Sequence, residues 1–157
     1  MGTFADVRSM AGNRLQYLTP NDWVLIRARA QRHTFKLGEE IVRQGEWGDN
    51  IYIIRRGEAS VELAGTATRA IVASLGPDDI CGEIAFLAQC KASAAVVAKE
   101  EDVEVDKISA HELRKILEAF PRLASRFYQS LALVMAQRLR STSGELAREM
   151  GLRDRHE

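Results

Sequence analysis

A Gly-Glu dipeptide at positions 82 and 83 opens the segment of this sequence whose residues are best suited to binding chemistry. The residues from 83 to 88 are helix formers, and they stand between segments that are typical of strands. The first turn of a helix carries backbone N–H groups without intrahelical partners, and such groups favour an anion such as a phosphate. Gly82 has no side chain, so the backbone can approach a ligand closely there. We therefore predict an anion-binding cassette at Gly82, Glu83, Ile84 and Ala85.

Other site chemistries find no support in the residue types and their spacing. Cys81 and Cys90 are the two cysteines, without metal-ligand spacing, and we expect plain thiols in a reducing cytoplasm. His33 and His111 have no partners at metal-binding or catalytic spacing. No nucleophile–base pair or paired acids emerge, so we expect a non-enzymatic protein with no metal and no required cofactor.

Short strands are expected to position this cassette. From about residue 31, segments rich in Val, Ile and Tyr are separated by glycines, a pattern typical of a closed β structure. Arg56-Gly57 lies between two such segments and predicts a hairpin, with a positive φ at Gly57. The strand candidates are 50–55, 58–63, 70–75, 93–98 and 104–108.

Helices are expected on both sides of the strands. Thr19-Pro20-Asn21-Asp22 predicts the start of an N-terminal helix, because Thr19 can cap and Pro20 suits the first helical position. Ser109 opens a second helix to about residue 118, and Pro121 starts a longer one. Ser141–Gly144 is expected to end or fray that long helix.

The whole-chain totals describe one domain. The chain has 157 residues, 46% of them hydrophobic, and Lys plus Arg equals Asp plus Glu at 22. A neutral total argues against a DNA-binding surface, and no apolar run approaches the length of a membrane span. We expect a flexible lead-in at 1–13, a domain at 14–140 and a polar tail at 141–157, in a cytoplasmic protein.

Two ordered sets of residues resemble a known family. The first is Gly38-Glu-Glu-Ile-Val-Arg-Gln-Gly-Glu46, followed by Gly48-Asp-Asn-Ile-Tyr-Ile-Ile54 and Gly57; the second is Leu75-Gly-Pro77, Asp79 and 82–87. Together they are similar to cyclic-nucleotide-binding domains, the family of the catabolite activator protein and the protein kinase A regulatory subunit. The resemblance implies a mainly β fold with flanking helices. This fold is a jelly-roll-like double-stranded β-helix, or β-roll, with a short phosphate-cassette helix, an N-terminal helix and C-terminal helices.

The resemblance also implies roles for the cassette residues. Glu83 would accept a hydrogen bond from a ribose 2′-hydroxyl, and the backbone of Ile84 and Ala85 would face the phosphate. Ser93 and Ala94 would line the pocket from the following strand. The implied ligand is cyclic AMP or cyclic GMP.

One departure from the family pattern concerns the phosphate. Members that bind cyclic nucleotides usually carry an Arg directly before the Ser or Thr of that strand, and the matching position here is Ala92. Lys91 lies one residue earlier and would point to the opposite face of a regular strand. It is a candidate phosphate ligand if the loop before the strand is irregular. A charge-assisted hydrogen bond contributes about 1.5–3 kcal/mol, so its loss weakens binding roughly 10- to 150-fold. A second departure is Asp78, where the family commonly has Gly.

Two functions therefore stay open. The first is a sensor that binds a cyclic nucleotide and signals through its C-terminal helices to an output protein in another chain. The 17 residues after position 140 are too few for the winged helix of the transcription-factor branch, so we expect no DNA-binding domain. The second is a degenerate member that has lost its ligand and serves as a protein-interaction or dimerisation module.

The apolar stripe of the long helix also has two interpretations. It can close the domain's own core, or it can pair with a second copy in a homodimer. In relatives the corresponding helix often caps the pocket and dimerises. The dimer contacts would be Leu131, Val134, Met135 and Leu139.

Overall fold

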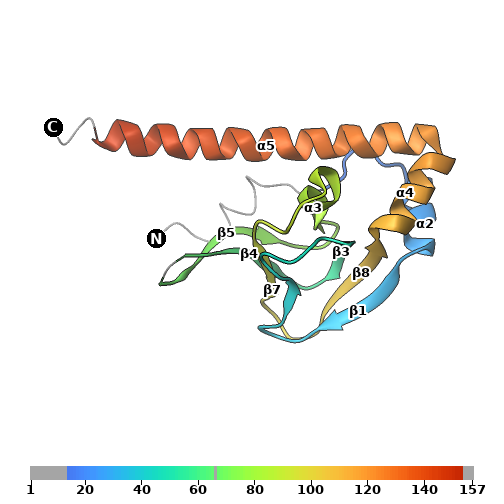
Figure 1. The fold of residues 1–157 in the computed structure, drawn as a ribbon, viewed down its shortest axis with the longest axis horizontal. Helices are drawn as coiled ribbons and strands as arrows, with labels where there is room; N and C mark the ends of the chain where they lie inside the picture. The colour runs from blue at the N-terminus through green and yellow to red at the C-terminus, as the bar shows by residue number, and fades with distance from the viewer. Residues whose placement is uncertain (1–13, 66, 154–157) are drawn as a thin grey trace.

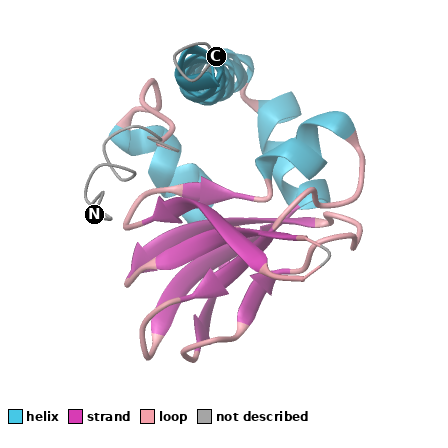
Figure 2. Ribbon diagram, turned by 90° about the vertical axis from the view of Figure 1, so that its left-hand side faces the viewer, coloured by secondary structure: helices cyan, strands magenta, loops and turns pink. Residues whose placement is uncertain are grey.

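Over residues 14–65 and 67–153, the computed structural model has eight strands in two antiparallel sheets, with the helices on one side (Figures 1 and 2). The first sheet has the order β1 (Gln31–Phe35), β8 (Val103–Ser109), β3 (Asn50–Arg56), β6 (Ile80–Cys81). The second has the order β2 (Glu40–Val42), β7 (Ala95–Ala98), β4 (Ala59–Ala64), β5 (Arg69–Leu75). The helices are α2 (Pro20–Ala28), α3 (Glu83–Ala88), α4 (Ala110–Ala119) and α5 (Pro121–Arg153). The expected lead-in at 1–13 lies outside the described residues.

The first sheet is buried on both faces and so divides the core in two. Ile51 and Ile53 of β3 belong to the cluster that includes the helices, whereas Ile54 belongs to the cluster inside the roll. The side chains of a strand alternate between the two faces of its sheet, which explains how β3 serves both clusters. The predicted mainly β class with flanking helices is confirmed.

The predicted hairpin at Arg56-Gly57 is wrong. β3 pairs with β6 and β8, whereas β4 pairs with β5 and β7, so the two strands that flank Gly57 belong to different sheets. Gly57 does adopt a positive φ of 92°, and a Cβ there would lie 3.1 Å from Val103 Cγ2. The turn at Gly57 therefore connects a strand of the first sheet to a strand of the second and does not close a hairpin.

The helix starts follow the sequence signals. The Thr19 side chain accepts from the backbone N–H of Asp22, and the Asp22 carboxylate accepts from the backbone N–H of Thr19, which completes a capping box. Ser109 caps α4 by accepting from the backbone N–H of Glu112. Both predicted caps are confirmed.

Helix α5 is longer than expected, because it continues through Ser141–Gly144 to Arg153. The predicted end at that segment is wrong. Gly in a helix interior costs about 1 kcal/mol, and the strong helix formers at 145–149 outweigh that cost. The segment expected as a polar tail is thus helical up to Arg153. No helix in the described part of the chain is long and apolar enough to cross a membrane.

The base of α5 is held to α2 by a nearly buried ion pair. Arg126 Nε lies 2.7 Å from Asp22 Oδ2, and Arg126 Nη2 lies 2.8 Å from Asp22 Oδ1. One turn further along, the buried Ser130 hydroxyl donates to the Arg126 carbonyl and accepts from the backbone N–H of Tyr17. These contacts fix where α5 begins and the direction in which it leaves.

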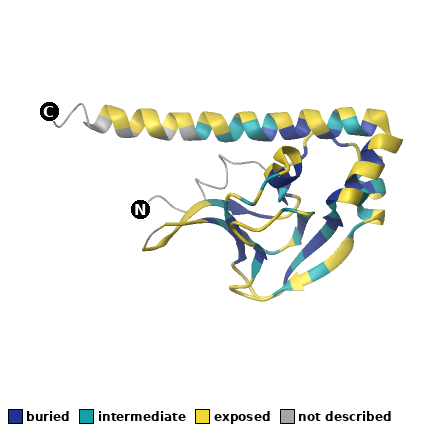
Figure 3. Ribbon diagram, viewed as in Figure 1, coloured by how far each residue is buried: buried dark blue, intermediate teal, exposed yellow. Residues whose placement is uncertain are grey.

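The apolar stripe of α5 divides into a covered part and an exposed part (Figure 3). Leu131 and Val134 are each 1% exposed and face the chain's own domain, so they are not available as the dimer contacts that we predicted. Met135 is half-buried, and Leu139 is 69% exposed. The first half of the stripe therefore closes the domain's own core.

Replacing Asp22 by Asn should lower the free energy of unfolding. Hydrogen bonds from Arg126 hold the pKa of Asp22 down from 3.8 to about 2, which corresponds to about 2 kcal/mol. Because the folded-state pKa is the lower one, this contribution is complete above pH 3.8 and disappears as the pH falls through about 2. Urea unfolding from pH 2 to pH 7 measures the difference.

Glu112→Gln provides the matched control, because its ion pairs with Arg29 and Lys115 are solvent-accessible and contribute roughly 0–1 kcal/mol. Equal losses for the two variants at pH 7 would contradict a special role for Asp22.

Candidate ligand-binding site

A cavity of about 460 Å³ lies between the second sheet, the start of α3 and the middle of α5. Of the eight candidate ligand-binding residues at 82–85 and 91–94, seven line it: Gly82, Glu83, Ile84, Ala85, Ala92, Ser93 and Ala94. The rest of its wall is mainly apolar: Val42, Val61, Leu63, Val72, Ala73, Cys81 and Val96. The cavity is completed by Arg138 and Ser141 from α5. Figure 1 shows α3 directly beneath α5.

Gly82 allows the cassette to start where it does. Its φ is +87°, and a Cβ at this position would lie 2.7 Å from the carbonyl oxygen of Asn50 in β3. Only glycine fits a positive φ next to another backbone at that distance. The start of α3 is therefore held tightly against β3, with Glu83 at its first position.

Glu83 is the most buried acid of the site, at 2% exposure, and its partner is Arg138. Glu83 Oε1 lies 2.6 Å from Arg138 Nη1, and the Arg138 side chain is 29% exposed. Burial raises the pKa of Glu83, while the guanidinium and a backbone N–H act in the opposite direction. The residue predicted to accept a ribose hydroxyl is thus already engaged by a cation from another element.

Lys91 does not take the place of the missing Arg. Its ammonium lies 5.9 Å from the centre of the Trp47 ring, and the backbones of these two residues form an isolated β-bridge. Lys91 is absent from the cavity lining. Strand β7 begins only at Ala95, so Ser93 and Ala94 line the cavity from a bend and not from a strand as predicted.

Arg138 and Ser141 were not predicted as site residues, although the sequence contains a signal for them. Leu131 and Val134 are buried, and Arg138 and Ser141 continue the same spacing of three and four residues along α5. Two polar residues on the buried face of a helix indicate a polar partner beneath them. The stripe was predicted from apolar residues alone, so it included Met135 and Leu139 and left out Arg138 and Ser141.

The cassette is also tied to α5 by aromatic packing. The rings of Phe86 and Phe127 meet edge to face with centroids 6.1 Å apart, and both side chains are buried. Arg114 of α4 lies over the Phe86 ring at 5.1 Å. Phe86 therefore links the cassette helix to both α5 and α4.

The cavity wall also contains a cysteine, Cys81. Burial raises the pKa of the Cys81 thiol, so this cysteine is an unreactive wall residue. No group of three or more His, Cys, Asp or Glu gathers as a metal site within 14–65 and 67–153.

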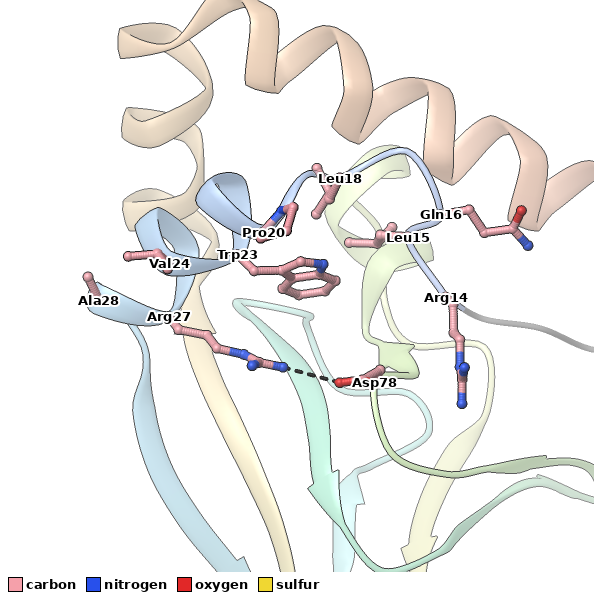
Figure 4. Close-up of a pocket in the computed structure, with 10 residues that line it drawn as sticks. All are labelled: Arg14, Leu15, Gln16, Leu18, Pro20, Trp23, Val24, Arg27, Ala28 and Asp78. Carbon is pink, nitrogen blue, oxygen red and sulfur yellow. Dashed lines mark hydrogen bonds and ion pairs between the residues drawn. The ribbon is translucent and has the colours of Figure 1, made fainter.

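A wider groove of about 930 Å³ lies on the far side of the cassette, beside α2 (Figure 4). Trp23 and Arg27 line it, and Arg27 pairs with Asp78 at 3.2 Å. Asp78, the second departure from the family pattern, has a positive φ of 70° and faces this groove and not the cavity. Its carboxylate therefore lies outside the anion site.

The fold and this site define a β-roll domain with a cavity of ligand size, and comparison with known proteins gives the family. A family model described as cyclic nucleotide-binding domain matches residues 32–120. The chain belongs to this family.

Two relatives illustrate the range of the family. The chain is 30% identical over 142 residues to cyclic GMP-binding protein C of Dictyostelium discoideum, covering 85% of this chain and 5% of that protein. It is 29% identical over 132 residues to the cyclic AMP receptor protein of Thermus thermophilus, covering 82% of this chain and 58% of that protein. The chain thus spans less than two thirds of the length of either relative.

Solved structures agree with the fold. The crystal structure of the Thermus thermophilus catabolite activator protein superposes with a TM-score of 0.71 at 27% identity. The match covers 83% of this chain and 59% of that one. A cyclic AMP-bound PfPKA-R structure superposes with a TM-score of 0.59 at 20% identity, over 72% of this chain and 41% of that one, which shows a shared fold.

Replacing Gly82 by Ala should destabilise the domain more than replacing Gly38 by Ala. Both glycines have positive φ, but a Cβ at Gly38 meets nothing within 4 Å, whereas one at Gly82 meets the Asn50 carbonyl. We expect a loss of about 1 kcal/mol for Gly38→Ala from the backbone conformation alone, and about 3 kcal/mol for Gly82→Ala. Urea unfolding checks both values, and equal losses would show that α3 can shift away from β3.

Proposed function

We propose that this chain is a sensor module that binds a cyclic nucleotide in the cavity beneath α5. The observation that carries the proposal is the cavity of about 460 Å³ in which the Gly82–Ala85 cassette and the buried Glu83 face an apolar wall. Small-molecule sites in proteins measure about 300–1,000 Å³ and combine apolar walls with a few placed polar groups. The ribose hydroxyl would bind at Glu83, and the phosphate would lie near the cassette backbone.

The position of α5 supports a signalling role. Arg138 and Ser141 form part of the cavity wall, so a ligand there touches the helix directly. A ligand that prefers one position of α5 shifts the population towards that position. The output would be carried by a partner protein in another chain, and the module itself would be non-enzymatic.

The names of the relatives support either purine nucleotide. One is called a cyclic GMP-binding protein and another a cyclic AMP receptor protein. Cyclic AMP and cyclic GMP are therefore the two ligands to test. A cytoplasmic location accords with Cys81 and Cys90, which are free thiols.

A second function is favoured by the state of the site itself. Ala92 supplies no charge, and Glu83 is already paired with Arg138. A ligand must compete with that ion pair without help from an Arg at position 92. A degenerate module that binds a protein in place of a nucleotide would keep the same fold and the same buried pair.

A homodimer through the far half of α5 is part of the proposal. Leu139, Leu146 and Met150 recur at seven and four residues along the helix and are 69%, 57% and 60% exposed. That spacing favours pairing with a second helix, because the three residues lie close to one face. This stripe replaces the buried Leu131 and Val134 as the dimer contact.

Calorimetric titration with cyclic AMP and cyclic GMP tests the nucleotide proposal. We expect saturable binding of at least one of them, with a dissociation constant in the micromolar range, together with a rise in melting temperature. Glu83→Ala should weaken binding at least 10-fold through loss of the ribose contact. Absence of heat and of a thermal shift up to about millimolar ligand would favour the protein-interaction module instead.

Sedimentation velocity tests the dimer. We expect the native chain to sediment as a dimer and the double variant Leu139→Glu, Leu146→Glu as a monomer, since two carboxylates would be buried at the interface. Leu37→Glu, at another exposed leucine, is the control and should remain dimeric. A native chain that is monomeric at high concentration would rule out this contact.

A further inference from the structure

The cavity contains a cation that does not come from the cassette. Of the described residues that line it, Arg138 is the only Lys or Arg. Its guanidinium lies against Glu83, and it enters the cavity from α5 and not from the loop that precedes β7. Position 92, where binding members of the family usually carry their Arg, lines the same cavity as an alanine.

The neighbouring basic residues have other partners. Lys91 is stacked on Trp47 outside the cavity. Arg69 and Lys99, on and beyond the second sheet, pair with the buried Glu62. Arg114 lies over the Phe86 ring. None of these four side chains lines the space in which Ala92 and Glu83 meet.

We propose that Arg138 binds the anionic group of the ligand and so supplies, from α5, the charge that Ala92 cannot. This inference rests on the proposed function, since it assigns the phosphate partner within the same cavity. A guanidinium has five N–H donors in a planar arrangement, so it can serve a carboxylate oxygen and a phosphate oxygen at once. The contact between Nη1 and Glu83 Oε1 places it at the cassette before a ligand arrives.

Because Arg138 belongs to α5, a negative charge on the ligand would act directly on the position of this helix. An Arg on the strand side of the cavity would attach the phosphate to the β-roll alone. Arg138 belongs to α5, whose base is held by Asp22 and whose far half is exposed. A phosphate bound by Arg138 therefore stabilises one position of α5, and the stabilisation increases with the negative charge of the phosphate.

A double-mutant cycle tests the assignment with the full chain. The variants are Arg138→Gln, Ala92→Arg and the combination of both, with Lys91→Gln as the matched control. Each is titrated with cyclic AMP and with adenosine, which lacks the phosphate. Melting curves verify that every variant is folded, and Arg138→Lys keeps the charge without the planar donors.

Arg138→Gln should weaken cyclic AMP binding by roughly 10- to 150-fold, the effect of losing a charge-assisted hydrogen bond. It should weaken adenosine binding clearly less, because adenosine has no phosphate to lose that contact. Lys91→Gln should change neither. Ala92→Arg should increase the affinity for cyclic AMP more in the Arg138→Gln background than in the native chain, because the two cations serve one group. Arg138→Lys should retain part of the preference for cyclic AMP.

Three results would overturn the inference. Equal loss of cyclic AMP and adenosine binding in Arg138→Gln would mean that Arg138 only supports the shape of the site. Unchanged cyclic AMP binding in Arg138→Gln would refute Arg138 as the phosphate partner while leaving the sensor proposal standing. A native chain that binds neither ligand, and gains cyclic AMP binding only with Ala92→Arg, would refute the sensor proposal and this inference together.

Discussion

The ion pair between Glu83 and Arg138 is the constraint on which the rest of this structure depends. A carboxylate with 2% exposure is costly to keep ionised, and burial accordingly raises its pKa. The guanidinium at 2.6 Å offsets part of that cost, so the cassette and α5 are stabilised when they lie together. The cavity exists between them because Gly82 holds the start of α3 against β3 while Arg138 reaches down from the helix.

Helix α5 makes many contacts with the domain near its start and few near its end, so its far half is the part that can move. Its base is tied to α2 by Asp22 and Arg126, and Phe127 packs on Phe86 of the cassette. Beyond Arg138 the described side chains are mostly exposed, and the helix runs on past the cavity (Figures 1 and 3). Contacts that are dense at one end and sparse at the other allow a small change at the cassette to become a larger displacement at the far end.

Membership of the family does not by itself establish what the cavity of this chain binds. The match over residues 32–120 and the superposition on the catabolite activator protein establish the family and the fold. The strand side of the cavity contributes no cation among the described lining residues, because position 92 is alanine and Lys91 is stacked on Trp47. Function depends on the groups that face the ligand, so the α5 residues carry as much weight here as the cassette.

The sequence by itself determined the features that depend only on interactions between residues close together in the chain. The cap at Thr19, the positive φ at Gly57 and the cassette at Gly82 and Glu83 all depend on residues a few positions apart, and all were predicted. The sheet that each strand joins was not decided locally, since a glycine turn can close a hairpin or cross between sheets.

The contact between Arg138 and Glu83 was decided by the tertiary structure. The two residues are 55 positions apart, and they meet only because α5 packs over the cassette. Spacing along the helix could place Arg138 on the buried face, but only the tertiary structure shows which group lies beneath it. Among the described residues that line the cavity, the positive charge therefore comes from the packed helix and not from the cassette motif.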